Sequence, residues 1–349
     1  MNILATHTLT AARTGQQALA QLDRVSGPKT LFVLAGEGGA LMGTLSDGDI
    51  RRGLLAGADL QQSVTNLMNP RFRALRQGAY SVADLQALRQ QQIFLVPLLD
   101  DAGRLLRVVD LRASRSLLPL DAVIMAGGRG ERLRPLTDSV PKPLLPVGDK
   151  PIIEHNVDRL ISFGVRNFTI TIKYLGDLLI EHFGDGSAKD ALIRYTREDQ
   201  ALGTIGALAL VDNLEHDTVL VMNSDLLTDI DFEDFFATFQ ASGAEMAVAS
   251  VPYMVPVPYA VLEVDHERIL SFKEKPTYTY YSNAGIYLLK RSVIERIPKG
   301  EFFNATDLME GLIADGQKVG YYPLLSYWLD VGKHEDYRKA QEDIRHLQL

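Results

Sequence analysis

The sequence predicts an α/β protein built from two domains. The chain has 349 residues, 46% of them hydrophobic, so it is longer than a typical domain and apolar enough to bury two cores. The segment "SLLPLDAVIMAGG", residues 116–128, indicates the end of a helix, a joint that contains proline, and a new apolar strand that ends in glycine. We therefore place one domain in residues 1–118 and a larger one in residues 119–349.

Composition excludes several kinds of site and partner. The chain has no cysteine, so it forms no disulfide, thiolate metal site or thiol nucleophile, which fits a reducing cytoplasm. It shows neither a basic leader nor a run of 18 apolar residues, so we expect a cytoplasmic protein without membrane association. The formal net charge is −8. Residues 1–118 hold 13 Lys and Arg against 9 Asp and Glu, and the rest holds 23 against 35, so no nucleic-acid partner is expected.

The first domain contains a weak internal repeat. "FVLAGEGGALMGTLSDGDIRR" from Phe32 aligns with "VPLLDDAGRLLRVVDLRASR" from Val96, which places Gly39 over Gly103. Each copy predicts a strand, a glycine turn, a second strand and then a helix. The first domain is therefore expected to be a pair of small α+β units.

This repeat, with "GTLSDGDIRR" as its most specific part, resembles a tandem pair of CBS domains over residues 1–118. The resemblance implies that Ser46 and Asp49 hold the phosphate and ribose of a regulatory nucleotide. The second copy has Asp110 and Ala113 at these positions, so one site is expected. The same "SDGD" also suits a helix N-terminus, and this alternative stays open. Because CBS pairs commonly associate face to face, the resemblance also implies a homo-oligomer.

The second domain opens with a glycine-rich turn. "AGGRGERLRPLT", residues 126–137, directly follows the predicted apolar strand. Successive backbone N–H groups in such a turn make an anion site, and the arginines add positive charge for a polyphosphate. No Gly-Lys-Ser/Thr follows, so the turn is not a Walker loop, and Leu133 stands where a dinucleotide fingerprint needs glycine. The turn thus predicts a nucleotide-phosphate site of another kind.

The continuation, "AGGRGERLRPLTDSVPKPLLPVGDKPIIEH", resembles the signature of the sugar-1-phosphate nucleotidyltransferases, also called sugar nucleotide pyrophosphorylases. The likeness covers nearly all of residues 120–349 and implies a Rossmann-like domain with a mixed sheet. It implies that Arg132 clamps the triphosphate and that Lys142 approaches the phosphates of both substrates, as catalytic residues. Glu131 departs from the Thr or Ser of many members. The backbone implied to hold the base and phosphates is that of Ala126, Gly127, Gly128 and Gly130.

Later stretches match the same family in order. "REDQALGTIGAL" implies a nucleotide-base loop, and "DTVLVMNSDLL" predicts an apolar strand with polar residues at its carboxyl end, where ligands bind in open α/β sheets. "FKEKP" and "SNAGIYLL" match the sugar-phosphate wall, and "YWLDVGKHEDY" matches a Trp-x-Asp element. Ala260 stands where the family commonly has glycine. The residues implied are Glu198, Gly203, Thr204, Gly206 and Asn223 for the nucleotide, Glu274, Lys275 and Asn283 for the sugar phosphate, and Asp225 and Asp330 for a metal ion.

The implied reaction accounts for the two carboxylates. A phosphate oxygen of the sugar 1-phosphate attacks the α-phosphorus of a nucleoside triphosphate, so two anions must meet. Mg²⁺ takes oxygen ligands, commonly one or two carboxylates with substrate oxygens and water, which suits Asp225 and Asp330. The nucleophile is already ionised, so no strong general base is needed. We expect catalysis to rest on positioning and on Arg132, Lys142 and the metal ion.

The resemblance is strongest to bacterial CBS-containing guanylyltransferases, which make GDP-activated sugars for surface glycans. It implies GTP and a hexose or amino-hexose 1-phosphate as substrates. A uridylyl-, thymidylyl- or cytidylyltransferase of the same fold stays open, as does a regulatory subunit that binds nucleotide without turnover. The complete set of catalytic residues disfavours that subunit. A chain whose main function lies in the CBS pair is disfavoured more strongly, because only one of the two CBS sites has the matching residues. The segment "HEDYRKAQEDIRHL" predicts an amphipathic closing helix.

Overall fold

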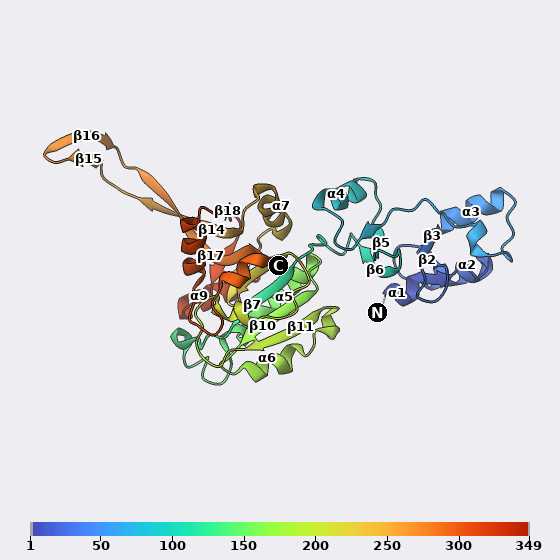
Figure 1. The fold of residues 1–349 in the computed structure, drawn as a ribbon, viewed down its shortest axis with the longest axis horizontal. Helices are drawn as coiled ribbons and strands as arrows, with labels where there is room; N and C mark the ends of the chain where they lie inside the picture. Colours follow the sequence, from blue (N-terminus) through green and yellow to red (C-terminus); the bar gives the residue numbers. More distant parts are fainter. Residues whose placement is uncertain (1–2, 348–349) are drawn as a thin grey trace. The chain divides into compact units, whose positions relative to one another are not determined.

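The computed structural model describes residues 3–347, which fall into two compact units, residues 3–117 and 118–347 (Figure 1). Each unit has its own sheets and its own buried apolar clusters. No helix in the described range is long and apolar enough to cross a membrane.

The N-terminal unit is an internal repeat of one topology. The sheet order is β1-β2-β3 in the first copy and β4-β5-β6 in the second. In each copy the first two strands are parallel and the third is antiparallel to the second. The repeat predicted from the sequence is therefore present in the fold. The elements are α1 (Ile3–His7), β1 (Thr8–Thr10), α2 (Gly15–Arg24), β2 (Thr30–Leu34), β3 (Leu41–Ser46), α3 (Asp47–Leu55), a 3-10 helix (Val64–Asn66), β4 (Leu75–Arg76), α4 (Val82–Gln90), β5 (Leu95–Leu99) and β6 (Leu105–Asp110).

The helix expected at the end of the second copy is wrong. A short turn follows β6 where α3 follows β3 in the first copy. Asp110 explains the difference, because its carboxylate accepts a hydrogen bond from the Arg112 backbone N–H at 3.0 Å and an ion pair from the Arg112 guanidinium at 3.1 Å. Such a local side-chain bond competes with helix formation. The sequence also predicts the end of a helix in "SLLPL", residues 116–120. This prediction is wrong too, because the chain forms neither helix nor strand there before β7 begins.

The C-terminal unit is built on a seven-stranded mixed sheet with the order β11-β10-β7-β12-β17-β14-β18. Strands β11, β10, β7 and β12 are parallel, and β17 is antiparallel to both of its neighbours. The strands are β7 (Asp121–Ala126), β8 (Pro146–Val147), β9 (Lys150–Pro151), β10 (Asn167–Ile172), β11 (Leu192–Arg197), β12 (Thr218–Asn223), β13 (Leu226–Thr228), β14 (Met246–Pro256), β15 (Val261–Asp265), β16 (Arg268–Lys273), β17 (Thr277–Lys290), β18 (Val319–Pro323) and β19 (Trp328–Asp330).

Helices cover this sheet on both faces, which is why its central strands are continuously apolar. In α7, Asp231 accepts hydrogen bonds from the first-turn backbone, and four phenylalanines, among them Phe232 and Phe235, are buried. On α9, Ala340 is buried, with Tyr337 and Ile344 packed against the same cluster, which confirms the predicted closing helix. The helices are α5 (Ile152–Ser162), α6 (Gly176–Phe183), α7 (Phe232–Ser242), α8 (Ala305–Ala314) and α9 (His334–Asp343), with 3-10 helices Glu131–Leu133, Lys142–Leu144, Ser187–Lys189, Gly206–Leu210 and Arg291–Arg296.

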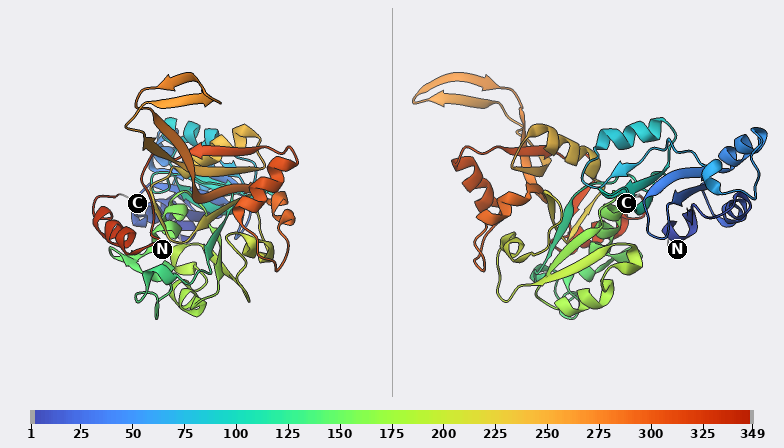
Figure 2. Two further views of the ribbon diagram at one scale, coloured as in Figure 1. Left: turned by 90° about the vertical axis from the view of Figure 1, so that its left-hand side faces the viewer. Right: turned by 45° about the vertical axis from the view of Figure 1, so that its right-hand side comes forward.

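A long two-stranded ribbon leaves the sheet. Strands β14 and β17 stay paired from Val251 and Ser282 out to Pro256 and Thr277, beyond the reach of β12 and β18. The hairpin β15–β16 continues from there, and the views of Figure 2 show it projecting away from the sheet. We call residues 252–281 the arm.

Candidate active site

The glycine-rich segment after β7 forms a tight loop against Lys142. Gly130 has a φ of +63°, a conformation that residues with a β-carbon rarely adopt. A β-carbon on Gly130 would also lie 2.8 Å from Cβ of Lys142. The Thr137 hydroxyl donates a hydrogen bond to the Gly130 carbonyl at 2.9 Å. At the start of the loop, Ala126 is buried as the last residue of β7. The loop therefore holds its backbone against the buried side chain of Lys142.

Lys142 and three further charged residues form a cluster beside this loop. The Lys142 side chain is buried, and its ammonium forms an ion pair with the Asp225 carboxylate. The same ammonium lies 3.9 Å from Oδ1 of Asp330. The Arg132 guanidinium packs over Gly332, where a β-carbon would lie 3.5 Å away. The structure therefore brings together the two predicted catalytic cations and the two predicted metal ligands.

A two-stranded sheet makes Asp225 and Asp330 neighbours. β13 is antiparallel to β19, and Leu226, which follows Asp225, lies opposite Asp330. The Val331 backbone N–H donates to the Asp225 carbonyl at 3.0 Å. At the other end of the pair, the Thr228 hydroxyl donates to a backbone carbonyl at 2.9 Å. The backbone thus fixes the two carboxylates side by side.

The electrostatics of Asp330 suit a cation. Burial raises the pKa of Asp330 and the nearby Asp225 raises it further, while Lys142 and Arg132 act in the opposite direction. Its buried Oδ1 has no hydrogen-bond partner among residues 3–347. Two adjacent carboxylates with an unpartnered oxygen fit the oxygen preference of a divalent cation. Within the same range no three His, Asp or Glu residues are grouped to hold a metal ion, so the protein would supply only these two carboxylates.

A cavity of about 280 Å³ opens beside the cluster. It lies at the carboxyl ends of β7, β10 and β12, where ligands bind in open α/β sheets. Its lining combines glycine backbone, two lysines, carboxylates and one exposed aromatic ring, which is suited to an anionic ligand with a flat ring. The residues that line it include Gly127, Gly128, Lys142, Lys173, Glu198, Leu202, Gly203, Thr204, Asn223, Asp225 and Phe302.

Glu198 forms one wall of the cavity. Its backbone N–H donates to the Ile172 carbonyl at 2.9 Å, which fixes it directly after β11. Its carboxylate fills the space that a β-carbon on Gly127 would occupy. Burial raises the pKa of Glu198, although the Leu202 backbone and Lys173 oppose the rise. The cavity thus contains a largely desolvated carboxyl group that can accept hydrogen bonds.

The family model described as nucleotidyl transferase matches residues 121–346, which is more than half of the chain. The chain belongs to the nucleotidyl transferase family. The mixed sheet also confirms the expected α/β, Rossmann-like fold of the C-terminal unit. The matched residues contain the whole cavity and cluster, so we call the C-terminal unit the nucleotidyl transferase domain.

Named relatives match the same part of the chain. The mannose-1-phosphate guanylyltransferase of Mycobacterium tuberculosis is 36% identical over 231 residues, which are 64% of this chain and 64% of that protein. The mannose-1-phosphate guanyltransferase of Schizosaccharomyces pombe is 33% identical over 227 residues, 62% of each. The chain therefore spans less than two thirds of the length of these relatives. The solved structure of HddC from Yersinia pseudotuberculosis complexed with GMP-PN has a TM-score of 0.51 and 25% identity, and covers 64% of this chain and 99% of that one.

The second glycine loop of the nucleotidyl transferase domain packs against the segment before α8. Gly203 has a φ of +80°, and its β-carbon would lie 2.6 Å from the Phe303 carbonyl oxygen. A β-carbon on Gly206 would lie 2.8 Å from the Glu301 carbonyl oxygen. The Thr204 hydroxyl accepts a hydrogen bond from the first N–H of α8 at 3.0 Å. Thr204 therefore lines the cavity and also ties its loop to this helix.

The two predicted asparagines have different surroundings. Asn223 ends β12 and lines the cavity, and its Nδ2 would lie 2.6 Å from a β-carbon on Gly285. Asn283 lies where β17 enters the sheet. Its amide donates to the Tyr287 hydroxyl at 2.9 Å and accepts from the Gly285 N–H at 2.9 Å. Asn283 thus holds β17 in place, while Asn223 faces the ligand space.

Glu274 and Lys275 do not lie at the cavity in this structure. They form the exposed bend between β16 and β17, on the arm that Figure 2 shows projecting from the sheet. The reason is that β14 and β17 run on as a ribbon instead of turning back over the sheet. Ala260 is exposed on the same arm, and Glu131 is exposed at the start of its 3-10 helix. None of these four residues lines the cavity.

Ser46 and Asp49 form a helix cap in the N-terminal unit. The Ser46 hydroxyl donates to Asp49 Oδ2 at 2.6 Å and accepts from the Asp49 N–H at 3.3 Å. The same cap geometry occurs at Ser81 and Asp84, at the start of α4, with distances of 2.7 Å and 3.3 Å, although α4 is the counterpart of α2 and not of α3. The alternative of a cap at the helix N-terminus therefore accounts for the bonding of Ser46 and Asp49, and their regulatory role stays a prediction.

Lys173 and Phe302 also line the cavity, and the sequence analysis does not predict either of them as a site residue. Lys173 follows the apolar strand "NFTITI", so its place at the carboxyl end of β10 was a usable signal. Phe302, whose ring is 63% exposed, comes from a loop with no sequence signal of its own. Both residues are therefore candidates to contact a nucleotide.

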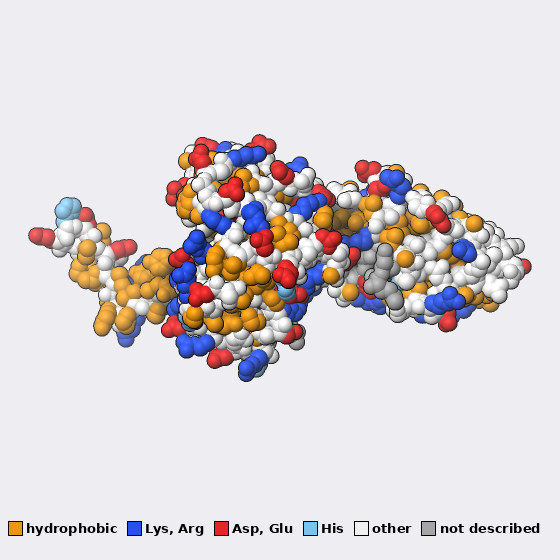
Figure 3. Space-filling model, turned by 90° about the horizontal axis from the view of Figure 1, so that it is seen from below, with side chains coloured by type: hydrophobic (Ala, Val, Ile, Leu, Met, Phe, Trp, Pro, Cys, Tyr) orange, Lys and Arg blue, Asp and Glu red, His pale blue; other side chains and the backbone are white. Residues whose placement is uncertain are grey.

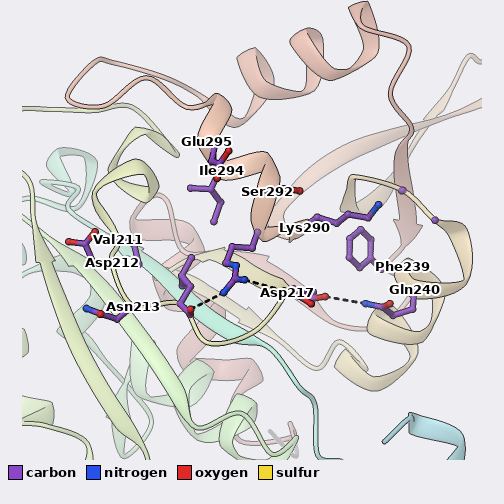
Figure 4. Close-up of a pocket in the computed structure, with 15 residues that line it drawn as sticks. Val211, Asp212, Asn213, Asp217, Phe239, Gln240, Lys290, Ser292, Ile294 and Glu295 are labelled. Carbon is purple, nitrogen blue, oxygen red and sulfur yellow. Dashed lines mark hydrogen bonds and ion pairs between the residues drawn. The ribbon is translucent and has the colours of Figure 1, made fainter. Parts of the chain in front are cut away.

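A larger cavity, of about 720 Å³, opens at the opposite end of the central strands, beside the start of β12 and the end of β17 (Figure 4). Arg291 there pairs with Asp217 at 3.3 Å, and Lys290 pairs with Glu245 at 2.6 Å. None of the residues predicted from the sequence lines this cavity. Its cations already have partners, so its size alone does not make it the active site.

Proposed function

We propose that this protein transfers a nucleotidyl group from a nucleoside triphosphate to a sugar 1-phosphate, which yields a sugar nucleotide and pyrophosphate. One observation carries the proposal. Arg132 and Lys142 lie close to Asp225 and Asp330, beside a glycine-lined cavity at the carboxyl ends of parallel strands, and Lys142 and Asp225 line that cavity. Paired cations and carboxylates in one place are what a reaction between two phosphate anions requires.

The proposed reaction needs positioning more than proton transfer. A phosphate oxygen of the sugar 1-phosphate forms a bond to the α-phosphorus, and the bond from that phosphorus to the bridging oxygen breaks. Pyrophosphate leaves with the electron pair. Because the attacking oxygen is already ionised, the chain need not supply a strong base. Lys142 and Arg132 would hold the two phosphates in line and stabilise the charge that develops on them.

We also propose that Asp225 and Asp330 hold a Mg²⁺ ion. Their adjacent carboxylates and the unpartnered Oδ1 of Asp330 fit such an ion. When bound, the ion would neutralise part of the charge on the phosphates. Lys142 would then share the Asp225 carboxylate with the metal, and the rest of the coordination would come from substrate and water.

GTP is the best-supported triphosphate. The edge of guanine presents N–H donors, including its 2-amino group, and the Glu198 carboxylate in the cavity is a suitable acceptor. The exposed ring of Phe302 offers a surface on which a base can stack. The names of the relatives support guanylyl transfer to mannose 1-phosphate, and the GMP-PN complex of the HddC neighbour supports a guanine ligand. We therefore place mannose 1-phosphate first among the hexose 1-phosphates.

Further parts of the proposal rest on the sequence resemblance. We propose that residues 1–118 are a CBS pair that binds a regulatory nucleotide at Ser46 and Asp49, and that residues 119–349 are the catalytic domain. The fusion of such a pair to a transferase suggests control by a cellular nucleotide. We also propose that the protein acts in the cytoplasm. Its product would be a sugar nucleotide for the synthesis of surface glycans.

Pyrophosphate release by the purified full chain with Mg²⁺ tests the function. GTP, UTP, CTP, dTTP and ATP are crossed with mannose, glucose and glucosamine 1-phosphates. We expect release with GTP and one sugar phosphate, and its loss in Asp225→Asn. Asp212→Asn is the matched control, because Asp212 is exposed and lies near the start of β12, at the opposite end of the strands from the candidate site. If neither the wild type nor the control releases pyrophosphate, although both still bind guanine nucleotide, the protein is a regulatory subunit and not a transferase.

A further inference from the structure

The arm exposes an unusual amount of apolar surface. Ten of its large hydrophobic side chains are between 49% and 74% exposed. They are Tyr253, Met254, Tyr259, Leu262, Val264, Ile269, Leu270, Phe272, Tyr280 and Tyr281. Figure 3 shows apolar side chains along the arm, outside the body of the domain. Isolated exposed apolar residues are ordinary, but a continuous patch of this kind marks a surface that another molecule covers.

Both faces of the ribbon are apolar. Successive residues in a strand point to opposite faces. Tyr253 and Met254 are neighbours in β14, and Tyr280 and Tyr281 are neighbours in the regularly paired part of β17, yet all four are more than half exposed. Among the described residues, no third strand pairs with β15 or β16. A two-stranded hairpin without a covering layer is at best marginally stable in water, so the arm needs a partner on each face.

The charge of the arm indicates what kind of partner this is. Residues 252–281 contain four Asp and Glu and three Lys and Arg, in a chain of net charge −8. An arm so close to neutral has no electrostatic attraction for nucleic acid or for an anionic membrane. It also carries little charge to repel an identical arm. A nearly neutral surface rich in tyrosine is typical of a protein interface.

We propose that the arm docks on a second copy of this chain and that the protein forms a dimer through it. In a twofold dimer each arm meets the same surface of the partner, so two identical ribbons can cover each other's faces and pair their free edges. With aromatic side chains that each bury about 150–250 Å², ten half-exposed residues supply on the order of 1,000 Å² per arm. Two arms therefore reach the roughly 1,600 Å² that a stable interface buries.

The base of the arm supports the same interface. The Tyr281 ring contacts the ring of Tyr321 on the edge strand β18, at 5.2 Å between centroids. Tyr321 is 59% exposed and Leu325, just beyond β18, is 81% exposed. The apolar surface of the arm thus continues onto the edge of the central sheet. A partner's arm can lie along this edge strand, which has a free side.

The mass of the full chain in solution tests the proposal, by sedimentation equilibrium over a range of concentrations. We expect wild type to have the mass of two chains. The double variant Leu270→Asp/Phe272→Asp, in β16, should have the mass of one chain with an unchanged circular dichroism spectrum. Ile313→Asp, equally exposed but on α8, is the control and should stay dimeric. A monomeric wild type, or an arm variant that stays dimeric through some other surface, would overturn the proposal.

A second measurement reports on the arm itself. The chain has no cysteine, so a nitroxide label on Thr279→Cys, an exposed arm residue, gives a signal from one site only. We expect dipolar coupling between the labels of two chains, and its loss when labelled protein is mixed with excess unlabelled protein. A dimer without coupling between these labels would show that the arms do not meet, and the proposal would fail. Neither measurement depends on enzyme activity.

Discussion

The buried ammonium of Lys142 forms an ion pair with Asp225, which lies 83 positions later in the chain. This contact links the glycine-rich loop after β7 to the strand end that carries a proposed metal ligand. It places a positive charge between two carboxylates before any ligand binds. Lys142 is therefore both a structural partner of Asp225 and the cation best placed to meet incoming phosphates.

Replacing Lys142 by methionine should remove most of the activity. The change keeps the length of the side chain but leaves the carboxylates and phosphates without a fixed cation. We expect kcat/KM for pyrophosphate release to fall by roughly 100-fold or more, as for loss of one preorganised charge-stabilising group. Lys299→Met, at an exposed turn, serves as control. A loss of only a few-fold would show that Lys142 is structural.

Gly130→Ala should destabilise the nucleotidyl transferase domain. The β-carbon would meet Cβ of Lys142 at 2.8 Å, in a backbone conformation with φ of +63°. We expect the free energy of unfolding in urea to fall by about 1–3 kcal/mol. Gly128→Ala is the matched control, because no atom lies within 4 Å of its added β-carbon and the fold should tolerate it. Equal stabilities for the two variants would contradict the close approach of the loop to Lys142.

Glu198→Gln should weaken guanine selection and stabilise the fold at neutral pH. An amide is a poorer acceptor for two N–H donors, so we expect kcat/KM for GTP to fall by about 10- to 100-fold. Because burial raises the pKa of Glu198 above 4.5, its ionised form costs folding free energy. The variant should therefore be the more stable protein at pH 7, and the gain should disappear below pH 4.5 as the carboxyl group becomes protonated. A gain that is independent of pH would contradict this explanation.

Asp121→Asn should destabilise the protein in a pH-dependent way. Asp121 is buried and accepts hydrogen bonds from the backbone N–H groups of Glu215 and His216, each at 2.8 Å. Burial opposes ionisation, but the hydrogen bonds and the charge of His216 outweigh it and hold the pKa below 3.8. Ionised Asp121 thus contributes stability above pH 3.8 that is lost as the pH falls through the lower, folded-state pKa.

The asparagine variant of Asp121 should lose about 1–3 kcal/mol of unfolding free energy at pH 7. The difference from wild type should shrink as the solution is acidified below pH 3.8. Urea unfolding at a series of pH values measures it, with Asp212→Asn as an exposed control. A constant difference at all pH values would show that Asp121 acts through packing and not through its charge.

The local sequence predicted the strands that carry the candidate active site, but not which segments lie next to them in the fold. The apolar runs "DAVIM" and "DTVLVMN" are strands β7 and β12 because both faces of the central sheet are covered. The closeness of Asp225 to Asp330 depends on the register of β13 against β19, which only the tertiary fold sets. Phe302 reaches the cavity from the loop before α8, and this position also depends on the tertiary fold.

The arm marks where pattern reasoning fails. "FKEKP" looked like part of a substrate wall, but its position depends on whether the ribbon turns back over the sheet or runs outward. Alternating side chains predict strands equally well in both cases. The helix predicted at the end of the second repeat is absent for a different reason. The hydrogen bond and ion pair between Asp110 and Arg112 form a turn in its place.

The pairing of β13 with β19 also has a consequence for biosynthesis. During translation Asp225 leaves the ribosome well before Asp330, because β19 follows β14, β17 and β18 in the chain. The strand pair that sets the two carboxylates side by side cannot form until this late segment has emerged. We therefore expect the nascent domain to collapse around β7, β10 and β12 first and to bring Asp225 and Asp330 together last. Chains stalled before Trp328 would be folded in part, and inert.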